Sequence, residues 1–362
     1  MEQSPRLPRR RGYLGKTPAT LFNLEEVVAI SLSCFSSPFR SPFSLFPPVK
    51  FPVSHKPNSP NPQLFLSEFL QQLINGLSLG AIYALIALGY TMVYGVLRFI
   101  NFAHSDVFMI GAFAGFYLSN YLPHESMGGG LVVLAGAMLL CAALGITIER
   151  LAYRPLRNRS KLNVLITAIG VSLLLENAGQ FFFGTKPKPF PVLFPVKDIN
   201  LGGGLVLSSN QLAVIIITVM LLVALQFIVL KTKIGTAMRA VSFNPVAASL
   251  VGINTDIVIS FTFGLGSALA GAGGILYSMN YQSIDPLMGI LPGLKAFVAA
   301  VLGGIGNIPG AALGGLLLGI IETFCNGSRW STYTDAIAFT LLILILLFKP
   351  AGLLGKLQVE KV

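Results

Sequence analysis

The uncharged stretch AFVAAVLGGIGNIPGAALGGLLLGII, residues 296–321, decides the fold of this chain. It is longer than the roughly 20 apolar residues that cross a ~30 Å hydrocarbon core as a helix. Its middle is unsuited to a continuous helix, because Pro309 lacks a backbone donor and four glycines between positions 303 and 310 weaken helix continuity. We therefore predict two half-helices that meet at a break inside the membrane.

The glycine cluster also has to be compared with a nucleotide-phosphate loop. A dinucleotide fingerprint needs a strand before the glycines, a helix after them and an acidic residue about 20 positions further on. Both flanks are apolar here, so this class of site is excluded. A break at membrane depth must be packed inside protein or face an aqueous cavity, which makes Gly304, Gly306 and Asn307 candidates for lining a translocation pathway. Close helix contact is the equal alternative for three neighbouring glycines: Gly310, Gly314 and Gly315.

The composition of the chain also indicates a membrane protein. Of 362 residues, 54% are hydrophobic and 11% are charged, with a mean hydropathy of +0.74, whereas a soluble domain has about 25% charged residues. The net charge of +11 is spread between apolar runs, which argues against a nucleic-acid partner. We predict an all-α polytopic membrane protein with about eight transmembrane segments, some broken or re-entrant. They are expected at 67–90, 101–119, 129–148, 164–183, 209–230, 257–279, 293–324 in two halves, and 333–349.

Two basic connections set the expected orientation. The connection at 149–161 carries five basic residues, and the one at 231–239 carries three. By the positive-inside rule both are cytoplasmic, so the 184–208 loop and Phe65 lie outside and the C-terminus lies inside. Arginines at 9–11 favour the opposite orientation, but residues so far from the first span count for less.

Residues 1–64 differ in kind from the rest of the chain. They are basic and rich in Pro and Ser, a composition that cannot build a core. We expect a disordered extension, with a transit peptide as the alternative, followed by a transmembrane domain over 65–362. Three cysteines without metal-ligand spacing predict neither a disulfide framework nor a metal site, and no cofactor site is expected: Cys34, Cys141 and Cys325.

Polar side chains interrupt two apolar segments. In RFINFAHSDVFMIGAF, residues 98–113, Asn101, His104 and Asp106 either line a pathway or belong to a short turn in which Asp106 caps the next helix. Glu176 lies inside an apolar span, where an unpaired charge costs several kcal/mol, so it is a further pathway candidate. The alternative is a structural polar contact with its neighbours Asn177 and Gln180.

A short helix with specified ends is predicted in the second basic connection. Asn244 suits the N-cap, Pro245 the first helical position and Gly252 the stop. A helix of about seven residues is unstable alone, so it must pack against its own membrane domain or a partner. We favour a docking helix over a plain connector because apolar residues such as Val246 and Leu250 lie beside a basic membrane face. Two further residues favour the helix: Ala247 and Ala248.

Three motifs in order carry a family resemblance. They are the segments at 75–113, NPVAASLVGIN at 244–254 and VLGGIGNIPGAALGG at 301–315. Together they resemble the shorter inner-membrane permease subunit of branched-chain amino acid ABC transporters, over nearly all of 65–362. The resemblance implies a partnership in the lipid bilayer with a second permease, two cytoplasmic ABC ATPases and a periplasmic solute-binding protein. It also implies that 244–252 is the coupling helix, although Val246 occupies the position where such helices often carry an acidic residue.

The function expected from this resemblance is import across the inner (plasma) membrane by alternating access. The chain has no phosphate loop of its own, because RRGYLGKT at 10–17 has Arg10 in place of the first glycine. It also lacks a nucleophile–base pair and clustered carboxylates, so we expect a translocator and not an enzyme. An ion-coupled secondary transporter or channel for a small polar solute is the alternative. Leucine, isoleucine and valine are not distinguished from urea or short amides by the sequence.

Overall fold

The computed structural model describes residues 62–355 except 124, 158 and 203. Helix α2 (Pro62–Leu97) opens this part, and its candidate membrane span is Leu66–Leu97. Of the predicted disordered extension at 1–64, residues 1–61 lie outside the described residues.

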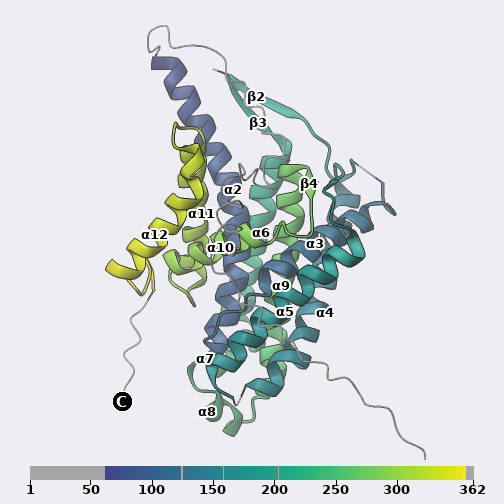
Figure 1. The fold of residues 1–362 in the computed structure, drawn as a ribbon, viewed down its shortest axis with the longest axis vertical. Helices are drawn as coiled ribbons and strands as arrows, with labels where there is room; N and C mark the ends of the chain where they lie inside the picture. The colour runs from purple at the N-terminus through teal and green to yellow at the C-terminus, as the bar shows by residue number, and fades with distance from the viewer. Residues whose placement is uncertain (1–61, 124, 158, 203, 356–362) are drawn as a thin grey trace, which may run out of the picture. The chain divides into compact units, whose positions relative to one another are not determined.

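The described part is helical, with two small two-stranded sheets, as Figure 1 shows. Seven of its helices are long and apolar enough to cross a membrane, close to the predicted eight, and α3 and α10 are shorter. The remaining helices are α3 (His104–Ser119), α4 (Met127–Ile148), α5 (Lys161–Phe183), α6 (Ser209–Lys231), α7 (Lys233–Phe243), α8 (Pro245–Leu250), α9 (Thr255–Tyr281), α10 (Ile290–Gly303), α11 (Ile308–Asn326) and α12 (Thr334–Phe348). Short helical turns are the π-helix η2 (Glu149–Tyr153) and the 3-10 helices η3 (Arg154–Leu156) and η4 (Ser331–Tyr333). The strands are β1 (Lys188–Pro189), β2 (Asp198–Gly202), β3 (Leu205–Ser208) and β4 (Ser283–Ile284).

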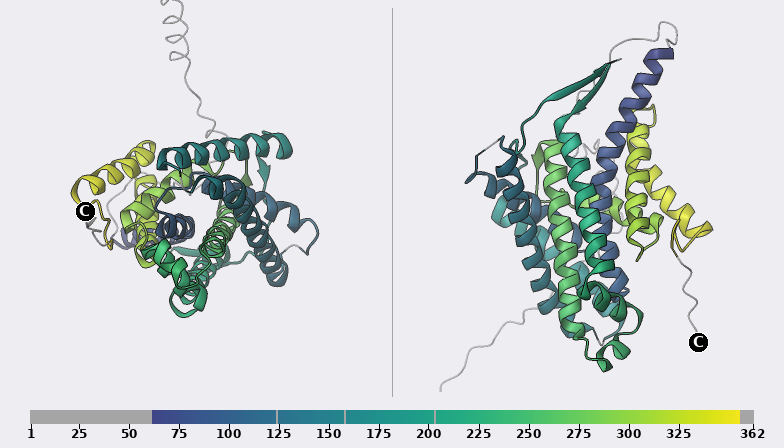
Figure 2. Two further views of the ribbon diagram at one scale, coloured as in Figure 1. Left: turned by 90° about the horizontal axis from the view of Figure 1, so that it is seen from below. Right: turned by 180° about the vertical axis from the view of Figure 1, so that it is seen from behind.

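Helices α2 and α9 form the centre of the membrane domain. α2 packs against α11, α9, α10 and α6, and α9 packs against α4 and α3 (Figure 2). The central helices are almost wholly buried, whereas α5, α6 and α12 keep many apolar side chains exposed. Exposed apolar helix faces of this kind are suited to lipid or to a second membrane subunit.

Glycines bring α2 and α11 into backbone contact. A Cβ atom added at Gly319 would lie 2.2 Å from the Gly80 backbone nitrogen, and one at Gly315 would lie 2.4 Å from the Ala84 nitrogen. Small residues permit this approach in membrane helices, which otherwise gain little from apolar burial. The alternative of close helix contact is thus confirmed at Gly315.

The predicted break between two half-helices is confirmed between α10 and α11. The backbone turns at Gly304 and Gly306, whose φ angles are +106° and +92°, a region that favours glycine. The two helices then fold back on each other, because an added Cβ at Gly314 would lie 2.1 Å from the Ala299 oxygen and one at Gly310 2.4 Å from the Gly303 oxygen. Both glycines are therefore close-contact residues, and the pair is a hairpin.

The segment after α12 satisfies backbone groups at this hairpin. The Leu353 amide donates to the Leu302 oxygen at 2.8 Å, and the Leu354 amide donates to the Gly303 oxygen at 3.1 Å. The Asn307 side chain in turn donates to the Leu354 oxygen at 2.8 Å. Because carbonyls at a helix end need such partners, this segment completes the C-terminal end of α10.

The two sheets lie at the end of the membrane domain opposite α7 and α8 (Figure 1). β2 pairs with β3 in an antiparallel hairpin, and β1 pairs with β4. The Gln71 side chain bonds both backbone groups of Val206, which ties the start of α2 to β3. This common end for the 184–208 loop and the start of α2 agrees with the predicted topology.

Candidate coupling and translocation sites

Helix α8 has the predicted ends. The Asn244 side chain accepts a hydrogen bond from the Ala247 amide at 3.0 Å, and Pro245 is the first helical residue. At the other end Gly252 has a φ of +84°, and the Ile253 amide donates to the Ala248 oxygen at 3.1 Å. This hydrogen-bond pattern stops a helix at glycine. Six residues are therefore held as a helix between two specified caps.

The two faces of α8 differ in exposure. Ala248 is 4% exposed and packs on the chain's own helices, whereas Leu250 is 83% exposed and Val246 69%. Phe243 and Val251 extend the exposed apolar surface. These four exposed residues, here called the α8 tip, face away from the membrane domain. Contiguous exposed apolar surface marks an interaction site, and it lies opposite Ala248, the residue that seals α8 to its own domain.

An ion network connects the chain immediately after α8 to the α4–α5 connection. Arg157 pairs with Glu149 and with Asp256 in the first turn of α9, the latter at 2.6 Å. Arg154 also pairs with Asp256, and the Ser260 hydroxyl donates to Glu149. Glu149 is fully buried, so removing its partner would leave an uncompensated charge. The network therefore ties the first turn of α9 to the end of α4.

Helix α7 is fixed to the ends of α2 and α6. The Ser242 hydroxyl donates to the Gly95 oxygen, and Arg98 donates to the Ser242 oxygen at 3.4 Å. Arg239 donates to the carbonyls of Val229 and Leu230 at 3.0 and 3.2 Å. Because cationic donors satisfy the free carbonyls at a helix C-terminus, Arg239 caps α6.

The polar candidates near α3 are buried and do not form an exposed turn. Asn101 accepts a hydrogen bond from the Tyr153 hydroxyl at 2.6 Å. The His104 ring lies against Tyr90, with centroids 4.6 Å apart. Gly89 makes room for that ring, because an added Cβ there would lie 2.3 Å from the His104 Nε2 atom. Both candidate side chains thus belong to the packed interior.

Asp106 does not cap α3 with its side chain. The N-cap residue is Ala103, and the buried Asp106 carboxylate instead accepts a hydrogen bond from Ser172 on α5. The capping alternative is therefore wrong. Glu176, one turn further along α5, is half-buried and within electrostatic range of Asp106. Its neighbour Asn177 is exposed and donates to its own helix backbone at the Leu173 oxygen, not to Glu176.

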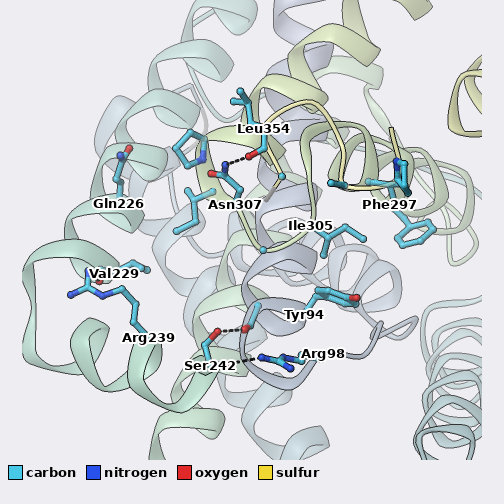
Figure 3. A pocket seen from close by; sticks show the side chains of 18 of the residues that line it. Tyr94, Arg98, Gln226, Val229, Arg239, Ser242, Phe297, Ile305, Asn307 and Leu354 are labelled. Atoms are coloured by element: carbon cyan, nitrogen blue, oxygen red, sulfur yellow. Dashed lines mark hydrogen bonds between the residues drawn. The ribbon is translucent and has the colours of Figure 1, made fainter. Parts of the chain in front are cut away.

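The residues of the hairpin turn lie elsewhere, at a groove of about 960 Å³ (Figure 3). Gly306 and Asn307 line this groove, whereas Gly304 packs against the segment after α12. Phe297 forms part of the groove wall and lies 6.2 Å from the Tyr90 ring, which in turn contacts His104. The predicted pathway residues thus form two groups, one near α3 and α5 and one at the α10–α11 turn. The rings of Tyr90 and Phe297 lie between the two groups.

Sequence reasoning missed the paired charges. Lys295 on α10 lies 2.7 Å from a Glu322 oxygen on α11 and 2.7 Å from an Asp335 oxygen on α12. Lys295 and Glu322 flank the uncharged run at 296–321, and Arg154 and Arg157 belong to the basic connection at 149–161. The available signal was that acidic residues accompany these cations in segments expected to be apolar or basic.

The membrane domain matches a known family of transport proteins. The family described as "Branched-chain amino acid transport system / permease component" matches residues 72–346. The chain belongs to this family of branched-chain amino acid permeases. As a family member it is a multi-pass membrane protein, and its relatives are transport permeases.

The chain covers nearly the whole length of two bacterial relatives. The chain is 44% identical to the high-affinity branched-chain amino acid transport system permease protein BraD of Pseudomonas aeruginosa, over 81% of this chain and 98% of that protein. It is 43% identical to the permease protein LivH of Escherichia coli K12 over the same shares. A probable LivH of Methanocaldococcus jannaschii is 30% identical over 75% of this chain and 88% of that protein.

Proposed function

We propose that this permease is the membrane-spanning subunit of an ABC importer that carries branched-chain amino acids across the inner membrane. The α8 tip is the observation that carries the proposal. An exposed apolar surface on a six-residue helix, fixed by caps at both ends, is suited to receive force from a partner subunit. The names of BraD and LivH support the substrate class.

Transport by this chain would need partner subunits that supply energy, complete the path and deliver the solute. Two cytoplasmic ABC ATPases supply the energy, since the sequence has no phosphate loop. A second permease packs on exposed apolar helices of this one and completes the path, and a periplasmic solute-binding protein delivers the solute at the opposite end. In this assembly the chain conducts solute and has no chemical step of its own.

The coupling route runs from the α8 tip into the membrane domain. Closure of the ATPases moves α8, and Asn254, which caps α9 through the amides of Asp256 and Ile257, passes the displacement to that helix. Arg157 carries the same displacement to Glu149 at the end of α4. Transport requires that the solute and the ATPases bind the outward and inward arrangements with different affinities.

The polar residues near α3 and α5 supply contacts for the solute on its path through the membrane domain. Asp106 and Glu176 on facing helices attract the ammonium group of a zwitterionic amino acid, and Asn101 and His104 lie on the same side of the domain. The His104 Nε2 atom has no hydrogen-bond partner in the described part of the chain. Gly306 and Asn307 line the separate groove that also holds Arg98 and Arg239, and we do not place them on this solute path.

Competition for uptake tests the proposed substrate class. The complete assembly, with the full chain, a second permease, two ATPases and the solute-binding protein, is reconstituted in vesicles and supplied with ATP and labelled leucine. We expect unlabelled isoleucine and valine to suppress uptake and urea and ribose to leave it unchanged. Vesicles that lack this chain are the control. Suppression by urea with no effect of isoleucine and valine would contradict the proposal.

A further inference from the structure

The groove of Figure 3 has a composition that solute translocation does not require. It lies among the end of α2, the end of α6, α7, the α10–α11 turn and the segment after α12. Its volume of about 960 Å³ is several times that of an amino-acid side chain. Two arginines, Arg98 and Arg239, line it, and none of the lining residues, all of which are described, is acidic. The groove is therefore positive at one side without an internal counter-charge.

The arginine at the end of α2 is available to a ligand. Arg98 is exposed and has a φ of +56°, a conformation that L residues rarely adopt. Its hydrogen bond to the Ser242 oxygen is long, at 3.4 Å. Arg239 lies on the other side of Ser242 and adds a second charge while it caps α6 (Figure 3). Guanidinium groups are well suited to phosphate because they donate in a planar fork.

Apart from the arginines and a few polar residues such as Gln226 and Asn307, the lining of the groove is largely apolar. Phe297, Val301 and Ile305 line its wall. Leu230 of α6 and Leu346 of α12 also line it, and both are about half exposed, so the groove is continuous with lipid-facing helix surfaces. A ligand that fits has an anionic head and a long apolar body. A zwitterionic amino acid fits poorly, because its ammonium group would meet arginines and no carboxylate.

We propose that this groove binds an anionic phospholipid of the cytoplasmic leaflet. The phosphate lies at Arg98, within the field of Arg239, and an acyl chain follows Val301, Ile305 and Leu346. Basic pockets between membrane helices on the cytoplasmic side are known to hold anionic headgroups. The bound lipid would pack against the α10–α11 turn and α7 together. This site is separate from the α8 tip and from the polar side chains near α3 and α5, so the lipid proposal does not depend on the proposed transport function.

Native mass spectrometry of the purified full chain tests this site. The chain in neutral detergent is offered phosphatidylglycerol or phosphatidylcholine with the same acyl chains, and retained lipid is counted. We expect phosphatidylglycerol to be retained preferentially, and Arg98→Gln to lower its retention by about fivefold, the effect of one arginine near an anionic headgroup. Phosphatidylcholine retention should not change. Arg150→Gln, at an exposed arginine outside the groove, is the matched control and should behave as wild type.

Further arms keep the proposal testable if Arg98→Gln fails to fold. Leu346→Glu, at an exposed position on the groove rim, should also reduce phosphatidylglycerol retention, because it adds a negative charge beside the acyl path. Equal retention of both lipids, or equal losses in Arg98→Gln and Arg150→Gln, would overturn the proposal. Displacement of the lipid by glycerol phosphate alone would indicate a free-anion site instead, and displacement by leucine would make the groove part of the translocation path.

Discussion

Single glycines determine how closely the central helices approach each other. At Gly319 and Gly80 the backbones of α11 and α2 touch, so even a methyl group at position 319 meets the Gly80 nitrogen at 2.2 Å. The obstacle is backbone, which cannot rotate away as a side chain can. At Gly170 on α5, by contrast, an added Cβ has no atom within 4 Å. The same residue type therefore has opposite significance at these two positions.

Gly319→Ala should destabilise the permease by about 1–3 kcal/mol, the usual effect of overpacking a tight contact. Gly170→Ala is the matched control and should be neutral or stabilise slightly, because alanine favours helix over glycine. The measurement is the free energy of unfolding of each purified variant in the same detergent. Equal values for the two variants would show that α2 and α11 are not in backbone contact.

Helix α8 has one buried face, at Ala248, and one exposed face, at Leu250. Ala248 is buried against its own domain, so a charge placed there would disturb the permease itself. Leu250 lies on the exposed α8 tip, so a charge there leaves the permease folded and acts on whatever binds the tip. A substitution that tests docking must therefore be made at Leu250 and not at Ala248.

Leu250→Asp should leave the permease folded in the membrane but reduce co-purification of the ATPase subunits at least tenfold, because a docked aspartate would be buried without a partner. Leu250→Met keeps the apolar surface and is the control, expected to co-purify like wild type. The readout is the amount of ATPase retained per permease. Full retention in Leu250→Asp would make α8 a connector.

Local signals explain which elements the sequence could predict. The α10–α11 break was predictable because glycine and proline act on their own backbone, and α8 was predictable because caps act within a few residues. Arg157 and Asp256 are 99 positions apart, and Lys295 lies on a different helix from Glu322 and Asp335, so spacing along the chain does not pair these charges. Asp106 shows the same limit, since the sequence suggested a cap whereas its partner is on α5.

The described part of the chain has a buried α2–α9 core, with the α8 tip at one end and the sheets at the other. The charges inside it are paired or neighbours of other polar groups, as Lys295, Glu149 and Asp106 illustrate. A transporter energised by ions would instead need an intramembrane charge that binds and releases an ion, and Glu176 is the residue that would serve. An ABC importer uses ATP and an ion-coupled transporter uses an ion gradient, so the energy source distinguishes the two mechanisms.

Leucine uptake with all ion gradients collapsed is the most direct test of the central claim, that partner ATPases drive this permease. The complete assembly in vesicles receives ATP on the ATPase side, labelled leucine with the solute-binding protein on the other, and ionophores for protons and sodium. Uptake should continue with ATP, stop with a non-hydrolysable analogue, and persist in Glu176→Gln at a measurable rate. Uptake that needs a proton or sodium gradient and proceeds without ATP would show that partner ATPases do not drive this permease.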